Sequence, residues 1–357
     1  LSRSKDFDPA SVNLKMKKSL SKRNIVNNQG NREMIIEVPW TGTPGEMETF
    51  IMADTLPNGE QVHDVYVLQA NKVYLQISEL VLDNSCSVVG GDYDESLGEH
   101  PATVQPIVSS DGSLQFTGWP QSHIKTYGQN QHFVFKNILF NGATVNQEWS
   151  ALFGVLSTYG EHNTVVVDGV SSVHHQVISY MNFGVMETLH LVNNTAVQFT
   201  SYPGGSAFGG FLWGGGSWMG TWKELIVRNN TIEGTFGQPL VLFHNGVHGD
   251  DPAIIDHNTF VNTSLEVKYY RDGNNTRFTN NLFVNTNSGG QTHNSRNSNM
   301  GHGRGPGWNT AGGNGKMSTL WQYPCEDPEL IANGMCWDNM NRNIEYNNNA
   351  WFDTEDL

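Results

Sequence analysis

One short pattern recurs along this chain, and its spacing constrains the fold more than any other feature of the sequence. Each copy places apolar residues at alternate positions, follows them with two polar residues and an asparagine, and ends on a further apolar residue. Three copies read LIVRNNTIEGT, AIIDHNTFVNT and TRFTNNLFVNT. A pattern that returns in successive segments indicates a repeat protein, in which each copy forms one structural unit.

The spacing of the copies predicts a parallel β-helix. We align seven copies on their turn residues, which are Asn137, Gly169, Asn194, Asn230, Asn258, Asn281 and Asn349. The first six lie 32, 25, 36, 28 and 23 residues apart. Because a strand rises about 3.3 Å per residue, a turn of this length holds three short strands and three bends. Successive turns then stack on one another, whereas a β-propeller blade would be longer and more uniform.

The asparagine at the bend has a physical reason in this architecture. An asparagine at the same bend of every turn can bond to its equivalents above and below, which satisfies an amide that would be costly to bury alone. In the copies around Asn194, Asn230 and Asn258, apolar residues lie five and three positions before the asparagine and two after it. These apolar residues are predicted to face the interior of the coil.

Strand signals begin near residue 65, where VYVLQ, KVYLQI, ELVLD, CSVVGG and ATVQPI follow one another between Gly, Asn, Asp and Pro residues. We therefore predict an all-β solenoid with three short strands per rung. The expected organisation is an N-terminal arm and cap over 1–60, the β-helix over 61–296, an irregular Gly-, Asn- and Trp-rich insert over 297–340, and a final rung over 341–357. A long irregular segment within a compact fold is usually functional or interactive.

Charge and hydropathy exclude two classes of partner. The formal net charge is −15, with 35 acidic and 20 basic residues. Such a surface disfavours nucleic acid and anionic membranes, which need clustered Lys and Arg. No apolar run approaches the roughly 18 residues that span a bilayer, so the chain is not expected to cross a membrane. The first residues, LSRSKDFDPA, lack the apolar core of a signal peptide, which fits a mature secreted form or a cytosolic protein.

The repeat resembles that of the right-handed parallel β-helix superfamily, which includes pectate, alginate and chondroitin lyases and related polysaccharide-processing proteins. The resemblance covers residues 65–290 and a last rung over 343–353. The opening VYVLQANKVYLQ, followed by VVGGD and PATVQP, is also similar to many secreted bacterial β-helix surface proteins of unassigned role. The resemblance implies a right-handed coil, a secreted or cell-surface location and a polysaccharide partner, although fold alone does not determine function.

In this superfamily the outward residues of the third strand of each rung form the ligand groove. We expect the third strands over 177–182, 207–215, 239–246, 264–270 and 289–295. Their alternation predicts that Trp213, Phe243, Lys268 and His293 lie on neighbouring rungs of one face. Aromatic rings beside charged groups suit a sugar chain, so Trp213, Phe243 and His293 are the predicted substrate-binding residues.

A lyase must neutralise a uronate carboxylate and remove the proton alpha to it, which needs a cation or metal and a base. The stretch LEVKYYRDG offers Glu266, Lys268 and Arg271, with Lys268 as the base if its pKa is lowered and Arg271 as the neutralising cation. Alginate and chondroitin lyases of this fold pair a lysine with an arginine about one rung later, whereas here only Arg296 lies later. The alternative is an exposed Lys and Arg that form ion pairs with Glu266 and Asp272.

The loop HNGVHGDDPAIIDH over 244–257 is a second concentration of chemical groups. His244 is a further candidate catalytic residue, and Asp250 and Asp251 are candidate metal ligands. Carboxylates would favour Ca²⁺, while His248 and His257 would favour Zn²⁺. The spacing matches no established metal motif, so a polar loop with Asp-Pro turn chemistry is the alternative interpretation.

The three cysteines do not make a disulfide framework. Cys325 and Cys336 bracket the segment PCEDPELIANGMC and could close it as a single bridge, and we predict that bridge. Two unpaired buried thiols are the alternative.

Two functions follow from these observations. The first is a secreted β-helix protein that acts on an acidic polysaccharide, by β-elimination in preference to hydrolysis. The second is a non-catalytic surface or structural β-helix that binds glycan or assembles with copies of itself.

Overall fold

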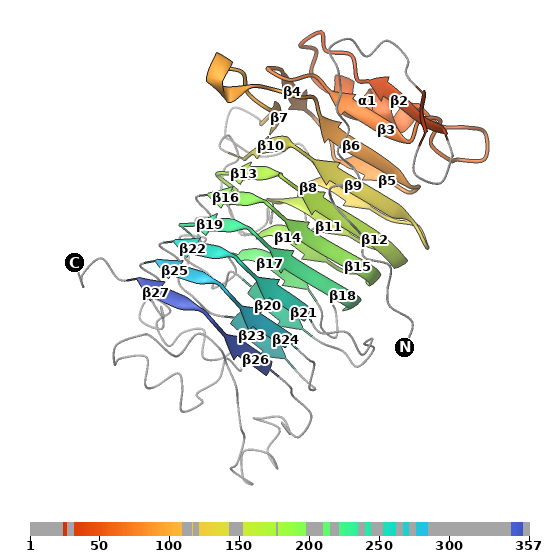
Figure 1. Ribbon diagram of the computed structural model, residues 1–357. Helices are drawn as coiled ribbons and strands as arrows, with labels where there is room; N and C mark the ends of the chain where they lie inside the picture. Colours follow the sequence, from red (N-terminus) through yellow and green to blue (C-terminus); the bar gives the residue numbers. More distant parts are fainter. Residues whose placement is uncertain are drawn as a thin grey trace.

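The computed structural model describes residues 24–26, 32–108, 116, 121–142, 153–175, 178–197, 210–214, 221–234, 240–243, 253–261, 267–270, 276–284 and 344–352. Within these residues the chain is a right-handed parallel β-helix built from three sheets (Figure 1). The expected strand over 289–295 and both cysteines of the predicted disulfide lie outside the described residues.

The first sheet has eleven strands, in the spatial order β1 (Asn24–Val26), β2 (Arg32–Glu37), β3 (Val65–Leu68), β6 (Cys86–Gly90), β9 (His132–Lys136), β12 (Glu161–Asp168), β15 (Val185–Val192), β18 (Thr221–Arg228), β21 (Ala253–Asp256), β24 (Thr276–Thr279) and β26 (Ile344–Asn347). The second sheet has nine, β4 (Val73–Gln76), β7 (Ala102–Pro106), β10 (Ile138–Asn141), β13 (Ser171–Val173), β16 (Thr195–Val197), β19 (Thr231–Glu233), β22 (Thr259–Val261), β25 (Leu282–Val284) and β27 (Ala350–Phe352). The third has seven, β5 (Leu80–Leu82), β8 (Gln121–Thr126), β11 (Phe153–Thr158), β14 (Ile178–Asn182), β17 (Gly210–Gly214), β20 (Leu240–Phe243) and β23 (Val267–Tyr270).

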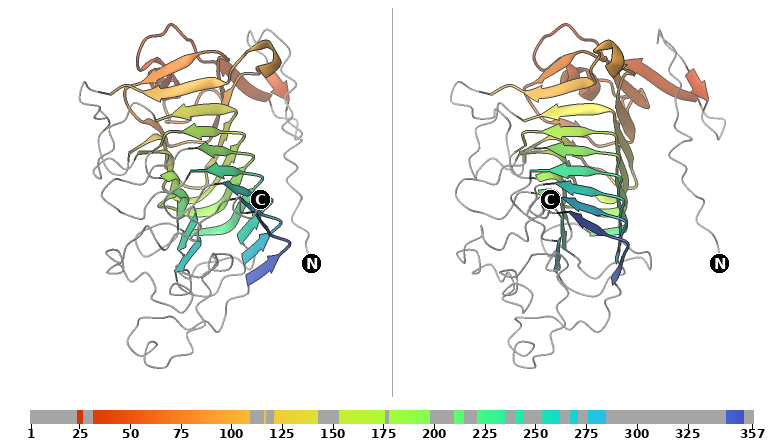
Figure 2. Two further views of the ribbon diagram at one scale, coloured as in Figure 1. Left: turned by 90° about the vertical axis from the view of Figure 1, so that its left-hand side faces the viewer. Right: turned by 60° about the vertical axis from the view of Figure 1, so that its left-hand side comes forward.

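The rungs from β3 to β23 each contribute one strand to the first sheet, one to the second and one to the third, and the two rungs after them are described in the first and second sheets. Every strand pairs in parallel with its counterpart in the neighbouring rung, and the one antiparallel pair among the described strands joins β1 to β2. The views in Figure 2 show these strands stacked as a ladder along one axis. The predicted fold class is therefore confirmed, and the five early strand segments correspond to β3, β4, β5, β6 and β7.

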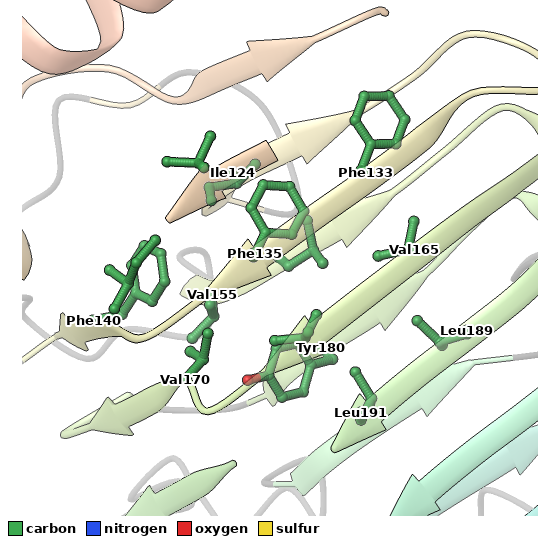
Figure 3. Close-up of a cluster of buried hydrophobic side chains, with 14 of the residues drawn as sticks. Ile124, Phe133, Phe135, Phe140, Val155, Val165, Val170, Tyr180, Leu189 and Leu191 are labelled. Carbon is green, nitrogen blue, oxygen red and sulfur yellow. The ribbon is translucent and has the colours of Figure 1, made fainter. Parts of the chain in front are cut away.

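Apolar side chains from all three sheets fill the interior of the coil (Figure 3). Phe133, Val165, Leu189 and Leu225 occupy one register column of the first sheet, so each side chain packs on its equivalent in the next rung. All four are at most 2% exposed. The apolar positions that the repeat predicted to face inward are buried in the same way, because the strand period of two sends alternate residues to the interior.

The N-terminal rungs carry the helix of this fold. Helix α1 (Glu46–Ala53) lies against β4 and β5, and its Met47 and Ile51 join the interior cluster. Glu48 is 2% exposed and accepts the backbone N–H groups of Ile77 (2.8 Å) and Ser78 (3.2 Å). A short 3₁₀ helix, η2 (Glu95–Leu97), follows β6. The described residues contain no helix with the length and apolar character needed to cross a membrane.

The predicted asparagine ladder runs through the bend between the first and second sheets. The side-chain oxygens of Asn230, Asn258, Asn281 and Asn349 accept the backbone N–H of the ladder residue one rung earlier, at 2.9, 3.0, 2.9 and 2.9 Å. Each amide nitrogen also donates to a backbone carbonyl of the preceding rung, as Asn230 does to Leu191 at 2.8 Å. The ladder continues from Asn281 to Asn349 although 68 residues separate them in sequence.

Two of the seven predicted anchors are one residue too early. Asn137 and Gly169 adopt left-handed backbone conformations, with φ of 54° and 65°, as Asn193 and Asn229 do in later rungs. The strand register places Ile138 and Val170 at the ladder position instead. Asparagine and glycine both tolerate positive φ, so the repeat pattern matched the turn residue in these two copies rather than the residue that faces inward.

The bend that carries the ladder has constant length. In the rungs of Val170, Asn194, Asn230, Asn258, Asn281 and Asn349, two residues separate the strand of the first sheet from the strand of the second. The varying distance between copies therefore arises at the other two bends.

Candidate functional site

The backbone register of the third sheet defines the face on which a ligand groove was predicted. One column of paired residues consists of interior side chains, namely Leu80, Ile124, Leu156, Tyr180 and Leu212, and it continues in register through Leu240 and Val267. The next column consists of Val81, Lys125, Ser157, Met181, Trp213, Val241 and Lys268. We call this second set the lysine column, because it has a lysine near each end.

Two of the predicted site residues share the lysine column. Trp213 on β17 and Lys268 on β23 pair through Val241 of the intervening strand, so their backbones are about 10 Å apart. Phe243 pairs with Tyr270 in a different column. The roles assigned to these residues stay predictions. The remaining site candidates, His244, Asp250, Asp251, Glu266, Arg271 and His293, lie outside the described residues.

The lysine at the other end of the column was not predicted from the sequence. Lys125 forms an ion pair with Glu79, with 2.9 Å between Nζ and Oε2, and the two side chains are only 8% and 10% exposed. The other carboxylate oxygen of Glu79 accepts the backbone N–H of Ser122 at 3.1 Å. Burial raises the pKa of Glu79, while Lys125 and the Ser122 N–H oppose that shift. Lys125 and Glu79 therefore form an ion pair that is largely shielded from solvent.

A stack of aromatic rings runs beside this pair at the ends of β8, β11 and β14. Tyr127 and Tyr159 are parallel with 4.7 Å between ring centroids, and Tyr159 and Phe183 follow at 5.1 Å. Burial raises the pKa of both phenols, and the negative charge of Glu79 adds to the shift in each. The three residues are half-buried, so part of each side chain is accessible to solvent.

Ser157 lies between Lys125 and Met181 in the lysine column and is fully buried. Within the described part of the chain its hydroxyl has no hydrogen-bond partner, which is uncommon because buried polar atoms are almost always paired. All six residues of β8 and of β11 are buried. The outer face of the third sheet is therefore covered at these two strands, in contrast to the open groove that the resemblance implied.

Lys125, Ser157 and the three stacked aromatic residues belong to a short repeated segment that the sequence analysis did not identify. The segments KTYG, STYG and MNFG occupy 125–128, 157–160 and 181–184. In each, the first residue enters the lysine column, the second faces inward, the third joins the aromatic stack and the fourth is glycine at the turn. A Cβ on Gly160 would approach the carbonyl oxygen of Gly128 to 2.0 Å, so the fourth position needs glycine for the rungs to stack.

The inward residues of the second and third segments are linked by a hydrogen bond. The hydroxyl of Thr158 donates to the side-chain oxygen of Asn182 at 3.0 Å, and that oxygen also accepts the backbone N–H of Gly184 at 3.0 Å. At the same bend, the amide of the fully buried Asn163 donates to the carbonyls of Tyr127 (3.1 Å) and Tyr159 (3.1 Å). The buried amide of Asn163 thus holds the backbone of two residues of the aromatic stack.

A buried pair of histidines joins the second and third sheets. His123 Nδ1 lies 2.7 Å from Gln76 Oε1, and its Nε2 lies 3.0 Å from His175 Nε2. The amide nitrogen of Gln76 donates to the carbonyl of His123, so Gln76 Oε1 is an acceptor and His123 carries its proton on Nδ1. His175 Nε2 must then be the donor. Burial lowers the pKa of both rings, to about 3 for His175, and both are neutral.

The structure offers neither a metal site nor a reactive thiol among the residues it describes. No group of three or more His, Cys, Asp or Glu side chains in these ranges could hold a metal ion. Cys86 is free and buried, and burial raises its pKa to about 12, which removes the thiolate that reactivity requires.

Neither a protein-family model nor a curated protein matches this sequence. The evidence on function is therefore the fold, which is often used by carbohydrate-active proteins, and the chemistry of the lysine column.

Proposed function

We propose that this protein acts on an acidic polysaccharide by β-elimination, along the outer face of the third sheet. The observation that carries the proposal is the register that puts Trp213 and Lys268 in one column, two strands apart. An aromatic ring and a cation at this separation suit a sugar chain that runs parallel to the coil axis, since the ring can stack on one sugar while the cation reaches the acidic group of another.

The reaction needs two groups from the protein. A base removes the proton on the carbon next to the uronate carboxylate, and a cation neutralises that carboxylate. The glycosidic oxygen then leaves from the neighbouring carbon as the double bond forms. Lys268 in its neutral form is the proposed base and Arg271 the neutralising cation. The departing oxygen takes its proton from water. Lys125 is unsuited to the role of base, because its ammonium group is held by Glu79 at 2.9 Å.

The test measures the ultraviolet absorbance of the unsaturated product on a panel of uronic-acid polymers. We expect cleavage by the native chain, its loss in Lys268→Ala, and a weaker reaction in Arg271→Ala that Arg271→Lys does not fully restore, because the planar guanidinium fork is lost. Lys223→Ala is the matched control, since Lys223 is a lysine of β18 in the first sheet with a 42% exposed side chain. An unsaturated product from Lys268→Ala at the native rate would overturn the assignment.

A non-catalytic glycan-binding function is the second candidate, and one observation favours it. The outer faces of β8 and β11 are covered, and the one lysine described there is neutralised by Glu79. In that case Trp213→Ala should weaken glycan retention, no cleavage should be detected on any polymer, and Lys268→Ala should have little effect.

A further inference from the structure

The outer face of the second sheet differs in composition from the rest of this acidic protein. Inward positions such as Val104, Phe140, Ala196, Ile232 and Phe260 are buried, so the residues on either side of them face outward. We define the second-sheet face as fourteen of these outward residues on seven consecutive strands: Thr103, Gln105, Leu139, Asn141, Ser171, Val173, Thr195, Val197, Thr231, Glu233, Thr259, Val261, Leu282 and Val284. Only Glu233 is charged among them, whereas the whole chain has a net charge of −15. This side of the coil faces the viewer in the left view of Figure 2.

A column of hydroxyl groups runs along this face. Ser171, Thr195, Thr231 and Thr259 pair in direct register on four consecutive strands, so their hydroxyls repeat about every 4.8 Å. None of the four residues is buried, and Thr231 is exposed. Three of the hydroxyls belong to threonine, whose β-branched side chain has restricted χ1 rotation. The hydroxyls are therefore regularly spaced and accessible to a ligand.

A parallel column supplies apolar contact. Val173, Val197, Val261 and Val284 lie two residues beyond the first column on their strands, with Glu233 between the second and third of them. The face thus offers one hydroxyl per rung on β13, β16, β19 and β22, with a valine beside it on every one of these strands except β19. A flat sheet with this repeat matches a linear partner that presents hydroxyls and C–H surfaces at a similar interval.

Charge and area decide which partner fits. A face with one carboxylate and no cation does not select an acidic polymer or a nucleic acid, which need Lys and Arg. Seven strands extend about 29 Å along the axis, and two outward positions per strand are about 7 Å apart, so the face covers only a few hundred Å². A stable protein interface buries about 800 Å² per partner, which is more than this strip offers to a second copy of the chain.

We propose that the second-sheet face binds an uncharged polysaccharide chain that lies parallel to the coil axis, with the hydroxyl column bonding to successive sugar units and the valine column against their C–H surfaces. Such binding would hold the protein on a neutral polymer while the third sheet stays free for an acidic one. The two faces are separate, so this proposal does not depend on the lyase activity.

The test is co-sedimentation of the full chain with insoluble cellulose, chitin and β-1,3-glucan. The variant Thr195→Val/Thr231→Val/Thr259→Val removes three hydroxyls but keeps the branched shape, and it should bind about tenfold more weakly, since each hydroxyl contributes a modest hydrogen bond. The matched control is Thr164→Val/Thr188→Val, which makes the same change at half-buried threonines of β12 and β15 in the first sheet. It should bind as the native chain does.

A second variant, Thr231→Lys, places a bulky charge in the middle of the face at an exposed position and should reduce binding even if the triple variant folds poorly. Lys268→Ala should bind the neutral polymers normally, which separates this proposal from the catalytic one. The proposal is overturned if no neutral polymer retains the protein or if the triple and control variants bind equally. It is also overturned if sedimentation velocity shows a native oligomer that the triple variant dissociates, because the occupant is then a second copy.

Discussion

Replacing Asn230 with alanine tests the physical basis of the repeat. Asn230 is 1% exposed, and its side chain makes three hydrogen bonds. Its oxygen accepts the backbone N–H of Asn194 at 2.9 Å, and its nitrogen donates to the carbonyl of Leu191 at 2.8 Å and to the side-chain oxygen of Asn258 at 2.9 Å. Three bonds at about 1 kcal/mol each, together with a buried N–H left without an acceptor, predict a loss of about 3–4 kcal/mol in the free energy of unfolding.

The adjacent residue provides the control for this measurement. Asn229 is exposed, has φ of 56° and makes one long side-chain contact of 3.3 Å to Asn193. Asn229→Gly removes that side chain and keeps the positive φ, so we expect a change below about 1 kcal/mol. Urea unfolding followed by tryptophan fluorescence and circular dichroism compares the two variants. If Asn230→Ala costs no more than Asn229→Gly, the ladder does not hold the rungs together and the explanation of the repeat is wrong.

Three further predictions concern groups in and around the third sheet. Lys125→Met should cost about 3 kcal/mol because it leaves the buried carboxylate of Glu79 without its cation, and adding Glu79→Gln should restore most of that loss in a double-mutant cycle. Gly160→Ala should prevent folding, judged by circular dichroism, since its Cβ would lie 2.0 Å from a carbonyl oxygen; Gly59→Ala, at a similar positive φ with no atom within 4 Å, should cost about 1 kcal/mol. Burial lowers the pKa of His175 to about 3, so between that value and its ordinary pKa near 6.5 the unfolded chain binds more protons, and stability falls as the pH falls. The loss at a pH of about 5 is about 2 kcal/mol, and His175→Gln should flatten the unfolding free energy over that interval; an unchanged slope would show that other groups cause the acid sensitivity.

The repeat sequence predicted the fold because its determinants are local to each rung. Alternation of apolar residues and an asparagine at a fixed offset were sufficient to predict the interior columns and the ladder at Asn230, Asn258 and Asn281. The alignment was wrong at Asn137 and Gly169 because the sequence signal for a left-handed turn residue is the same as the signal for a ladder residue one position later. Only the strand register distinguishes a turn residue from a ladder residue. Register depends on how the strand pairs with the neighbouring rungs, which the local sequence does not contain.

The site was harder to predict because its contacts join residues far apart in the sequence. Lys125 and Glu79 meet across the boundary between β5 and β8, and loops of different length separate those strands. The average spacing of the repeats therefore does not predict which residues of successive rungs lie side by side in the third sheet. The segments KTYG, STYG and MNFG did carry the information, since each ends on a glycine that the stacking requires. Aligning the chain on this second pattern would have placed Lys125, Ser157 and Met181 in one column.

The continuity of the ladder from Asn281 to Asn349 bears on how such a chain can change during evolution. The strands on either side of the intervening segment, β24 with β26 and β25 with β27, pair as directly as strands of adjacent rungs elsewhere. The described strands before and after the segment therefore lie in neighbouring rungs, with the same parallel pairing as elsewhere in the coil. The pairing of the scaffold is kept across this interruption, so a junction of this kind is where modules can be acquired, exchanged or removed by recombination.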